Sequence, residues 1–158
     1  MNFGDAYEQH VDDVYAYLAY RSRSARVAGE LTRETFERAR GGWTAFDPAR
    51  GSARVWLLAI ARTAYIDSRR RGMRGPRIAG EEGEDAGGMK IGSAAKGPDP
   101  EIAIALRRLE RREREAIALR FGGELRTAEI AELLGISVAN AQQILSRALR
   151  RLGAILER

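Results

Sequence analysis

The chain has 158 residues, a length that fits one domain of ordinary size or two small ones. It has no cysteine and one histidine, His10, which excludes disulfides, thiol nucleophiles and metal sites rich in cysteine or histidine. The formal net charge is +5, and all basic residues except Lys90 and Lys96 are arginines, which favours a polyanionic partner only mildly.

No apolar run approaches the roughly 18 residues that a membrane span requires. The amino-terminal stretch MNFGDAYEQHVDD is polar and acidic, unlike a secretory signal. We therefore expect a cytoplasmic protein with no membrane insertion.

Apolar residues in the first part of the chain recur with helical spacing. No segment there alternates apolar and polar residues for long enough to predict a strand. A first helix is predicted from apolar residues that recur at spacings of four, three and four. A second helix is predicted over 28–40 and ends at Gly41–Gly42. The apolar stripes are Tyr7, Val11, Val14 and Leu18 in the first helix, and Leu31, Thr35, Phe36 and Ala39 in the second.

A loop with Trp43, Phe46 and Pro48 follows, and Ser52 is predicted to cap a third helix that runs to about Arg71. The arginine run 69–71 suits either phosphate or the negative carboxy-terminal end of the helix. The predicted buried residues of this helix are Val55, Trp56, Leu57, Ile60, Ala61 and Ala64.

Residues 73–98 differ in composition from both flanks, because they are rich in glycine and carry the acidic cluster Glu81, Glu82, Glu84 and Asp85. Such a segment cannot offset its ordering entropy by burial, so we predict a flexible linker. Each flank is near the size at which a single core is marginal. We expect the halves to move relative to one another in the free chain, or to fold together against an inhibitor.

Four further helices are predicted after the linker. Asp99 is expected to cap the first, with Pro100 at its first position. Gly122–Gly123 separates the second from the third, which Thr127 is expected to cap. The predicted ranges are 100–109, 111–121, 127–134 and 138–156.

The last two of these helices have the pattern of a helix-turn-helix. Ala131 is small where the helices would cross, Gly135 permits a tight turn, and Ser137 can cap the longer second helix. This arrangement places the amino-terminal end of the second helix in a major groove of DNA. The alternative is a plain amphipathic bundle whose polar face is only solvated.

The two faces of the predicted helix 138–156 differ in chemistry. One is apolar and predicted to be buried, and the other carries amide and guanidinium groups that can bind adenine, guanine or phosphate. The buried face is Val138, Ala141, Leu145, Ala148, Leu152 and Ile155, and the polar face is Ala139, Asn140, Gln143, Ser146, Arg147 and Arg150.

Both halves of the chain resemble a known family, the sigma factors of the extracytoplasmic-function (ECF) group. In the second half, 127–137 and 145–148 resemble the carboxy-terminal domain of these proteins, and 109–121 resembles their LPxREREVxxLRY stretch. In the first half, 30–36 (ELTRETF) resembles DLTQETF. Residues 46–48 and 52–71 resemble the family's FDP and SFRAWLxxIARNxAIDxxRRR segments, so both halves match in the right order.

The resemblance implies an all-α fold of two small helical domains joined by a flexible linker. Sigma region 2 would occupy 1–72, the linker 73–98, and sigma region 4, with the helix-turn-helix, 99–158. It also implies a protein that binds core RNA polymerase and promoter DNA and directs transcription initiation. We expect neither enzymatic activity nor a cofactor. We do expect an anti-sigma factor to control the protein.

The same resemblance implies three sets of site residues. The upstream (minus-thirty-five) element would be read by Arg126, Thr127, Ala139, Asn140, Gln143, Ser146, Arg147 and Arg150. The minus-ten element, where a base leaves the stack, would be bound by Phe46, Arg50, Arg54, Arg62, Thr63, Tyr65, Arg69 and Arg70. Core polymerase would contact Glu30, Arg33, Glu34 and Glu37.

Some positions depart from the family pattern, most importantly Gln142 and Ile144, which replace the usual basic pair of the recognition helix. Two alternatives therefore stay open: a sigma-like interaction protein that has lost promoter activity, and a stand-alone helix-turn-helix repressor. The other departures are Glu30 for Asp, Arg33 for Gln, Thr63 for Asn and Glu110 for Pro.

Overall fold

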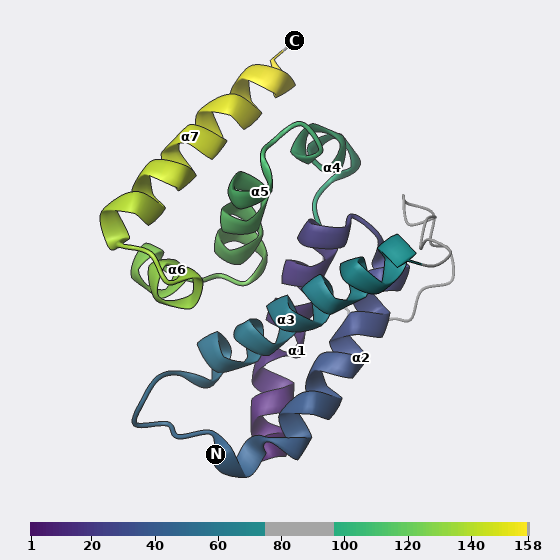
Figure 1. Cartoon of the computed structure of the whole chain (residues 1–158), viewed down its shortest axis with the longest axis vertical. Helices are drawn as coiled ribbons and strands as arrows, with labels where there is room; N and C mark the ends of the chain where they lie inside the picture. Colours follow the sequence, from purple (N-terminus) through teal and green to yellow (C-terminus); the bar gives the residue numbers. More distant parts are fainter. Residues whose placement is uncertain (75–96, 158) are drawn as a thin grey trace.

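The computed structural model describes residues 1–74 and 97–157, and every regular element in these ranges is helical, as the sequence predicts. The helices form two groups that lie against each other (Figure 1). The predicted linker falls almost wholly outside the described residues. The first group is α1 (Phe3–Ser22), α2 (Ala25–Gly41) and α3 (Ala53–Arg74), and the second is α4 (Pro100–Leu106), α5 (Arg111–Ile117), α6 (Thr127–Leu134) and α7 (Val138–Leu156).

Side-chain caps set where α2 and α3 begin. Ser24 Oγ accepts a hydrogen bond from the Val27 N–H at 3.2 Å, and for this reason α2 begins earlier than the predicted residue 28. Ser52 Oγ accepts one from the Val55 N–H at 3.1 Å, which confirms the predicted cap of α3. A short 3₁₀ turn, η1 (Trp43–Ala45), begins the loop between the two helices.

The first three helices bury most of the predicted apolar residues. Tyr7 is an exception: it is 41% exposed, and its ring packs edge-on against Phe36 with 4.9 Å between centroids. Leu58 lies outside the predicted stripe of the third helix but is fully buried, because Gly123 of the second group packs against its side chain.

The second group departs from prediction at two helix ends. α4 ends at Leu106 rather than at 109, and α5 passes after Ile117 into a π-helical turn, η3 (Ala118–Gly122). The N–H of Gly123 donates to the Ala118 carbonyl at 3.0 Å, which closes this wide turn.

The helix-turn-helix forms at the predicted boundaries. Gly135 adopts a left-handed φ of 72° in the turn, and Ser137 Oγ accepts a hydrogen bond at 3.0 Å from the first turn of α7. The predicted cap of α6 is wrong by one residue. Arg126, not Thr127, takes the cap position, and its N–H donates to the Glu129 carboxylate at 2.9 Å.

The two groups share a continuous apolar core, and we call their contact the seam. α5 and η3 lie against α1, while α6 lies against the beginning of α3 (Figure 1). The approach is close, since a Cβ atom on Gly122 would lie 2.8 Å from the backbone of Ala16 and Tyr17. In this structure the two halves therefore pack together through their own side chains, while the expected movement of the halves in the free chain stays a prediction.

Candidate nucleic-acid interface

The polar face of α7 is exposed, as a helix that reads DNA requires. The Gln142 amide donates a hydrogen bond to Ser146 Oγ at 3.4 Å, which links two neighbouring turns of this face. The predicted residues Ala139, Asn140, Gln143, Arg147 and Arg150 are exposed, and Ser146 is half-buried.

Two α7 residues lie where the sequence does not predict them. Val138 is 53% exposed rather than buried, at the amino-terminal end of the helix. Ile144 is 5% exposed and lies in the core. Of the two departures in the recognition helix, only Gln142 therefore lies on the surface.

Arg126 and Thr127 lie at the beginning of α6, where free backbone N–H groups favour phosphate. The Arg126 guanidinium is exposed and lies 3.3 Å from the Glu129 carboxylate. Burial alone would raise the pKa of Glu129, but the hydrogen bond from the Arg126 N–H and the nearby guanidinium lower it on balance. Glu129 therefore stays charged and orients Arg126.

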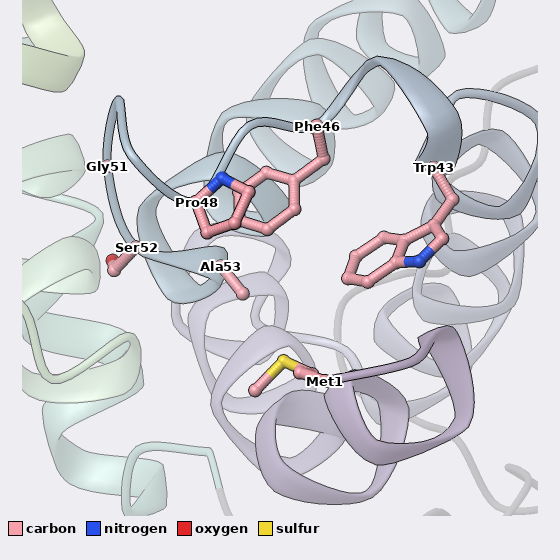
Figure 2. A pocket seen from close by; sticks show the side chains of 7 residues that line it. All are labelled: Met1, Trp43, Phe46, Pro48, Gly51, Ser52 and Ala53. Atoms are coloured by element: carbon pink, nitrogen blue, oxygen red, sulfur yellow. The ribbon is translucent and has the colours of Figure 1, made fainter.

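Three half-buried aromatic side chains form a cluster at the loop between α2 and α3. Trp43 stacks on Phe46 with 5.1 Å between ring centroids, and Trp56 lies 5.7 and 5.1 Å from them. Trp43 and Phe46 flank a pocket of 330 Å³ that Met1 and Pro48 also line (Figure 2). The cluster is thus both a small local core and a surface on which a flat ring can stack.

The predicted minus-ten residues of α3 have different partners. Arg54 is half-buried beside Asp13, with 3.1 Å between Nε and the carboxylate, and Arg70 is exposed at 3.5 Å from Asp67. Arg62 pairs with Glu115 across the seam, and the Tyr65 hydroxyl bonds to the Arg21 carbonyl of α1. The exposed members of the predicted minus-ten set are Arg50, Thr63, Arg69 and Arg70.

A buried polar cluster at the seam is centred on Glu115, whose side chain is 6% exposed. Its carboxylate lies 2.7 Å from Arg21 Nε and 3.2 Å from Arg62 Nε, and it accepts the Tyr17 hydroxyl at 2.8 Å. The Arg21 guanidinium covers the Tyr65 ring at 4.5 Å from its centroid. The Tyr65 hydroxyl donates to the Arg21 carbonyl at 3.3 Å.

The charges of this cluster follow from burial and from Glu115. Burial raises the pKa of Tyr17 well above its ordinary value, and the Glu115 charge raises it further, so the phenol stays neutral. Burial alone would lower the pKa of Arg21, but Glu115 raises it on balance, so the guanidinium stays charged. The cluster is therefore a neutral donor and two cations around one carboxylate.

Two of the acidic residues of α2, Glu30 and Glu34, each pair with an arginine on the same helix. Glu30 lies 3.4 Å from Arg26, and Glu34 lies 2.6 Å from Arg38. The remaining residues predicted for polymerase contact, Arg33 and Glu37, are exposed on α2.

Sequence reasoning missed Tyr17, Arg21 and Glu115 as site residues. A signal was available in α1 and α3, where adjacent apolar pairs such as Leu57 and Leu58 indicate burial on two sides. Among the described residues no group of three or more His, Asp or Glu side chains could hold a metal ion. None of the described helices has the length and apolar character needed to span a bilayer.

Comparison with known proteins matches the two halves separately. Residues 6–75 match the family model of sigma-70 region 2, and residues 101–152 match that of sigma-70 region 4. The chain is 29% identical to the ECF RNA polymerase sigma factor SigM of Bacillus subtilis, over 100% of this chain and 97% of SigM. It is also 29% identical to the ECF RNA polymerase sigma factor BldN of Streptomyces coelicolor, over 98% of this chain and 60% of BldN.

Two solved structures have the same fold. One is the sigma factor RpoE in complex with the anti-sigma factor NepR from Bartonella quintana, with a TM-score of 0.78 and 20% identity over 98% of this chain and 96% of RpoE. The other is CnrH in complex with the cytosolic domain of CnrY, with a TM-score of 0.73 and 23% identity over 98% of this chain and 87% of CnrH.

Proposed function

Since this chain belongs to the sigma-70 family of RNA polymerase sigma factors, in its ECF group, we propose that it binds core RNA polymerase, recognises two promoter elements and directs transcription initiation. The observation that carries this proposal is the presence of regions 2 and 4, in order, on one chain. A stand-alone repressor would use only the second half, and would leave the aromatic loop and the acidic side of α2 without a role.

The minus-thirty-five element is read by α7 in the major groove. Asn140 and Gln143 offer amides that pair with adenine, and Arg147 offers the fork that pairs with guanine. Arg126 and Thr127 position the motif on the phosphate backbone from the beginning of α6. Ile144 lies in the core, so its replacement of a basic residue does not change the exposed polar face of α7. This weakens the case for a sigma-like protein without promoter activity.

The minus-ten element is bound by the first half. Unstacking a base costs a few kcal/mol, which aromatic stacking and phosphate contacts must offset. Phe46 and Trp43 provide a stacking surface beside the 330 Å³ pocket, and exposed Arg50 lies on the same loop. Arg54, Arg62, Thr63, Tyr65, Arg69 and Arg70 complete the proposed set.

Core polymerase is bound by the exposed side of α2. Its carboxylates are paired only within the helix or with neighbouring arginines at the surface, so they remain available to a basic partner at little cost. The proposed contact residues are Glu30, Arg33, Glu34 and Glu37.

An anti-sigma factor is the proposed regulatory partner. Of the two solved structures that share the fold, one is a sigma factor in complex with the anti-sigma factor NepR, and the other is CnrH in complex with the cytosolic domain of CnrY. The apolar side chains that this chain leaves exposed on its second half, such as Ile104, Leu149 and Leu156, would suit a helix of that partner. Purification from the native cell under non-inducing conditions should yield a co-eluting chain, and elution of an active protein alone would refute the proposal.

The function is tested by transcription in vitro with core polymerase on a pool of randomised promoters. We expect transcripts that begin at defined sites downstream of two enriched sequence elements. Transcripts no more abundant than with core polymerase alone would refute the proposal. Repression of a promoter by the chain without core polymerase bound would favour the repressor instead.

A further inference from the structure

Arginines from both halves gather where the carboxy-terminal end of α1 meets α4 and α5. Tyr20, in the last turn of α1, packs there against an apolar group that includes Leu106 of α4 and Ile117 of α5. The arginines around this junction lie close enough for their charges to act on one another. We call this set the arginine cluster, and its members are Arg23, Arg69, Arg107, Arg111 and Arg114.

Two members of the arginine cluster, Arg23 and Arg114, are half-buried. Arg23 Nη1 donates to the Arg21 carbonyl at 3.5 Å, and the same oxygen accepts the Tyr65 hydroxyl at 3.3 Å. Arg114 Nη1 donates to the Leu109 carbonyl. The Nε atoms of both arginines are buried and have no hydrogen-bond partner among the described residues. Backbone carbonyls thus fix two guanidinium groups, each of which has five N–H donors and so keeps several for a ligand.

Carboxylates do not neutralise the arginine cluster. In the described part of the chain, no Asp or Glu oxygen lies within 4.0 Å of any of its members. Glu115 is close by but already pairs with Arg21 and Arg62. The ends of α1 and α4, beside Arg23 and Arg107, offset only about half an elementary charge each. Half-buried cations in this setting need a further negative charge.

The positive charges of the arginine cluster oppose one another. Burial lowers the pKa of Arg23 from its ordinary value, and the charges of Arg107 and Arg69 lower it further. Burial also lowers the pKa of Arg114, with a further lowering by Arg21 and Arg23. An anion bound between these groups would remove the repulsion and would supply the acceptors that their N–H groups lack.

We propose that the arginine cluster is a binding site for a small anion of the diphosphate class. Arg23 and Arg114 hold its oxygens with their guanidinium forks, a geometry that matches phosphate. The exposed members Arg69, Arg107 and Arg111 add charge at the rim. A diphosphate carries more charge than a single phosphate group and therefore suits this many cations. A nucleic-acid backbone fits less well, because the half-buried forks lie at a junction of helices rather than along an open groove.

The binding test titrates the full chain with inorganic pyrophosphate and, separately, with ADP by isothermal titration calorimetry. The ionic strength is held at about 0.15 M, so that general screening is the same in each titration. At least one probe should bind saturably with a Kd below about 1 mM. Tighter binding of ADP would identify a nucleotide as the source of the diphosphate, and tighter binding of pyrophosphate a free diphosphate.

Substitutions then locate the binding. Arg23→Gln and Arg114→Gln each remove one charge and keep a polar side chain. Each should weaken binding by about tenfold or more, because hydrogen bonds to a charged group are lost. Arg112→Gln makes the same change at an exposed position of α5 outside the cluster and should leave the affinity nearly unchanged.

Thermal unfolding separates a binding role from a structural one. Without pyrophosphate, Arg23→Gln should unfold at a higher temperature than the parent, because a repelling charge is removed. With saturating pyrophosphate the unfolding temperature of the parent should rise, by mass action, and that of Arg23→Gln should not. If Arg23 served only the structure, its loss would lower the unfolding temperature in both conditions.

Failure of both probes to bind saturably, or equal losses of affinity in Arg112→Gln and the two cluster variants, would overturn the inference. So would a labelled single-stranded DNA that binds more weakly to Arg23→Gln when neither probe binds, which would assign the arginines to nucleic acid. These assays contain neither promoter nor polymerase. Their failure is therefore distinguishable from a failure of the proposed function, which transcription measures.

Discussion

Tyr17 is fully buried and donates its hydroxyl to Glu115 at 2.8 Å, and burial raises its pKa above the ordinary value near 10. A group whose pKa is raised by folding stabilises the folded state below its unfolded pKa, and this contribution is lost as the pH rises toward the folded pKa. The free energy of unfolding should therefore fall as the pH rises above about 10.

The change Tyr17→Phe isolates this effect. At pH 8 the variant should unfold with a free energy about 1.5–3 kcal/mol lower, because a buried hydrogen bond to a charged acceptor is lost. The difference from the parent, measured by urea unfolding between pH 8 and 11, should shrink as the pH rises. A difference that stays constant with pH would show that Tyr17 does not titrate with folding.

Gln143 and Arg147 are exposed on α7 and are proposed to read base edges. Changing either to Ala should reduce transcription from a selected promoter, with about 1–3 kcal/mol of discrimination lost at the one base pair opposite that residue. Transcription from single-base promoter variants measures this. Arg112→Ala, also exposed but outside the helix-turn-helix, should have no such effect, and an equal loss on every sequence would assign the residue to phosphate contact.

The residues of the helix-turn-helix were predictable because their roles are local. Ser137 caps the helix that it precedes, and Gly135 takes the left-handed turn. The Glu115 cluster was not predictable, because Tyr17 and Glu115 are 98 residues apart and no periodicity links them. Ile144 was misplaced for a related reason, since its burial depends on how α7 is rotated against the core.

At the scale of elements, the exposed acidic side of α2 carries the proposed polymerase contact. The double change Glu30→Lys and Glu34→Lys should weaken binding to core polymerase by about tenfold or more, because like charges then meet at the interface. The helical circular-dichroism signal should stay the same, since the pairs lost with Arg26 and Arg38 are surface pairs worth under about 1 kcal/mol each.

The matched control for this surface is Glu8→Lys with Glu101→Lys, which reverses the same charge at exposed positions elsewhere. It should leave polymerase affinity unchanged. Equal losses in the two double variants would mean that overall charge, rather than the side of α2, decides the binding.

The turn of the helix-turn-helix depends on its backbone conformation. Gly135 has a φ of 72° and no neighbour within 4 Å of an added Cβ, so Gly135→Ala should cost about 1–2 kcal/mol through the left-handed backbone alone. Gly153→Ala, inside α7 and equally unhindered, should instead stabilise the helix by up to about 1 kcal/mol. Urea unfolding measures both, and shifts of the same sign would contradict the account.

Sequence patterns predicted the helix ends that local signals determine. They did not predict the backbone features that tertiary contacts determine. α6 and α7 have the predicted ends, and Ser52 caps α3 as expected. The π-helical turn after Ile117 was not predicted, because it lies where Gly122 meets the backbone of α1, a contact that the pattern of one helix does not encode.

At the scale of the whole molecule, the two halves share a core in the free chain although the sequence favours separate units. Two marginal cores of this size gain stability when they bury apolar surface against each other. The same contact includes an ion pair between the halves, in which Arg62 Nε lies 3.2 Å from the Glu115 carboxylate.

As proposed above, both halves of the chain bind one promoter at the same time on core polymerase. The most direct test takes a promoter selected from the randomised pool and inserts about 5 base pairs, half a helical turn, between its two elements. We predict that transcription falls sharply, because the upstream element then faces the opposite side of the duplex from α7. Transcription that is unaffected by the insertion would contradict the account, since it would mean that only one half of the chain reads the promoter.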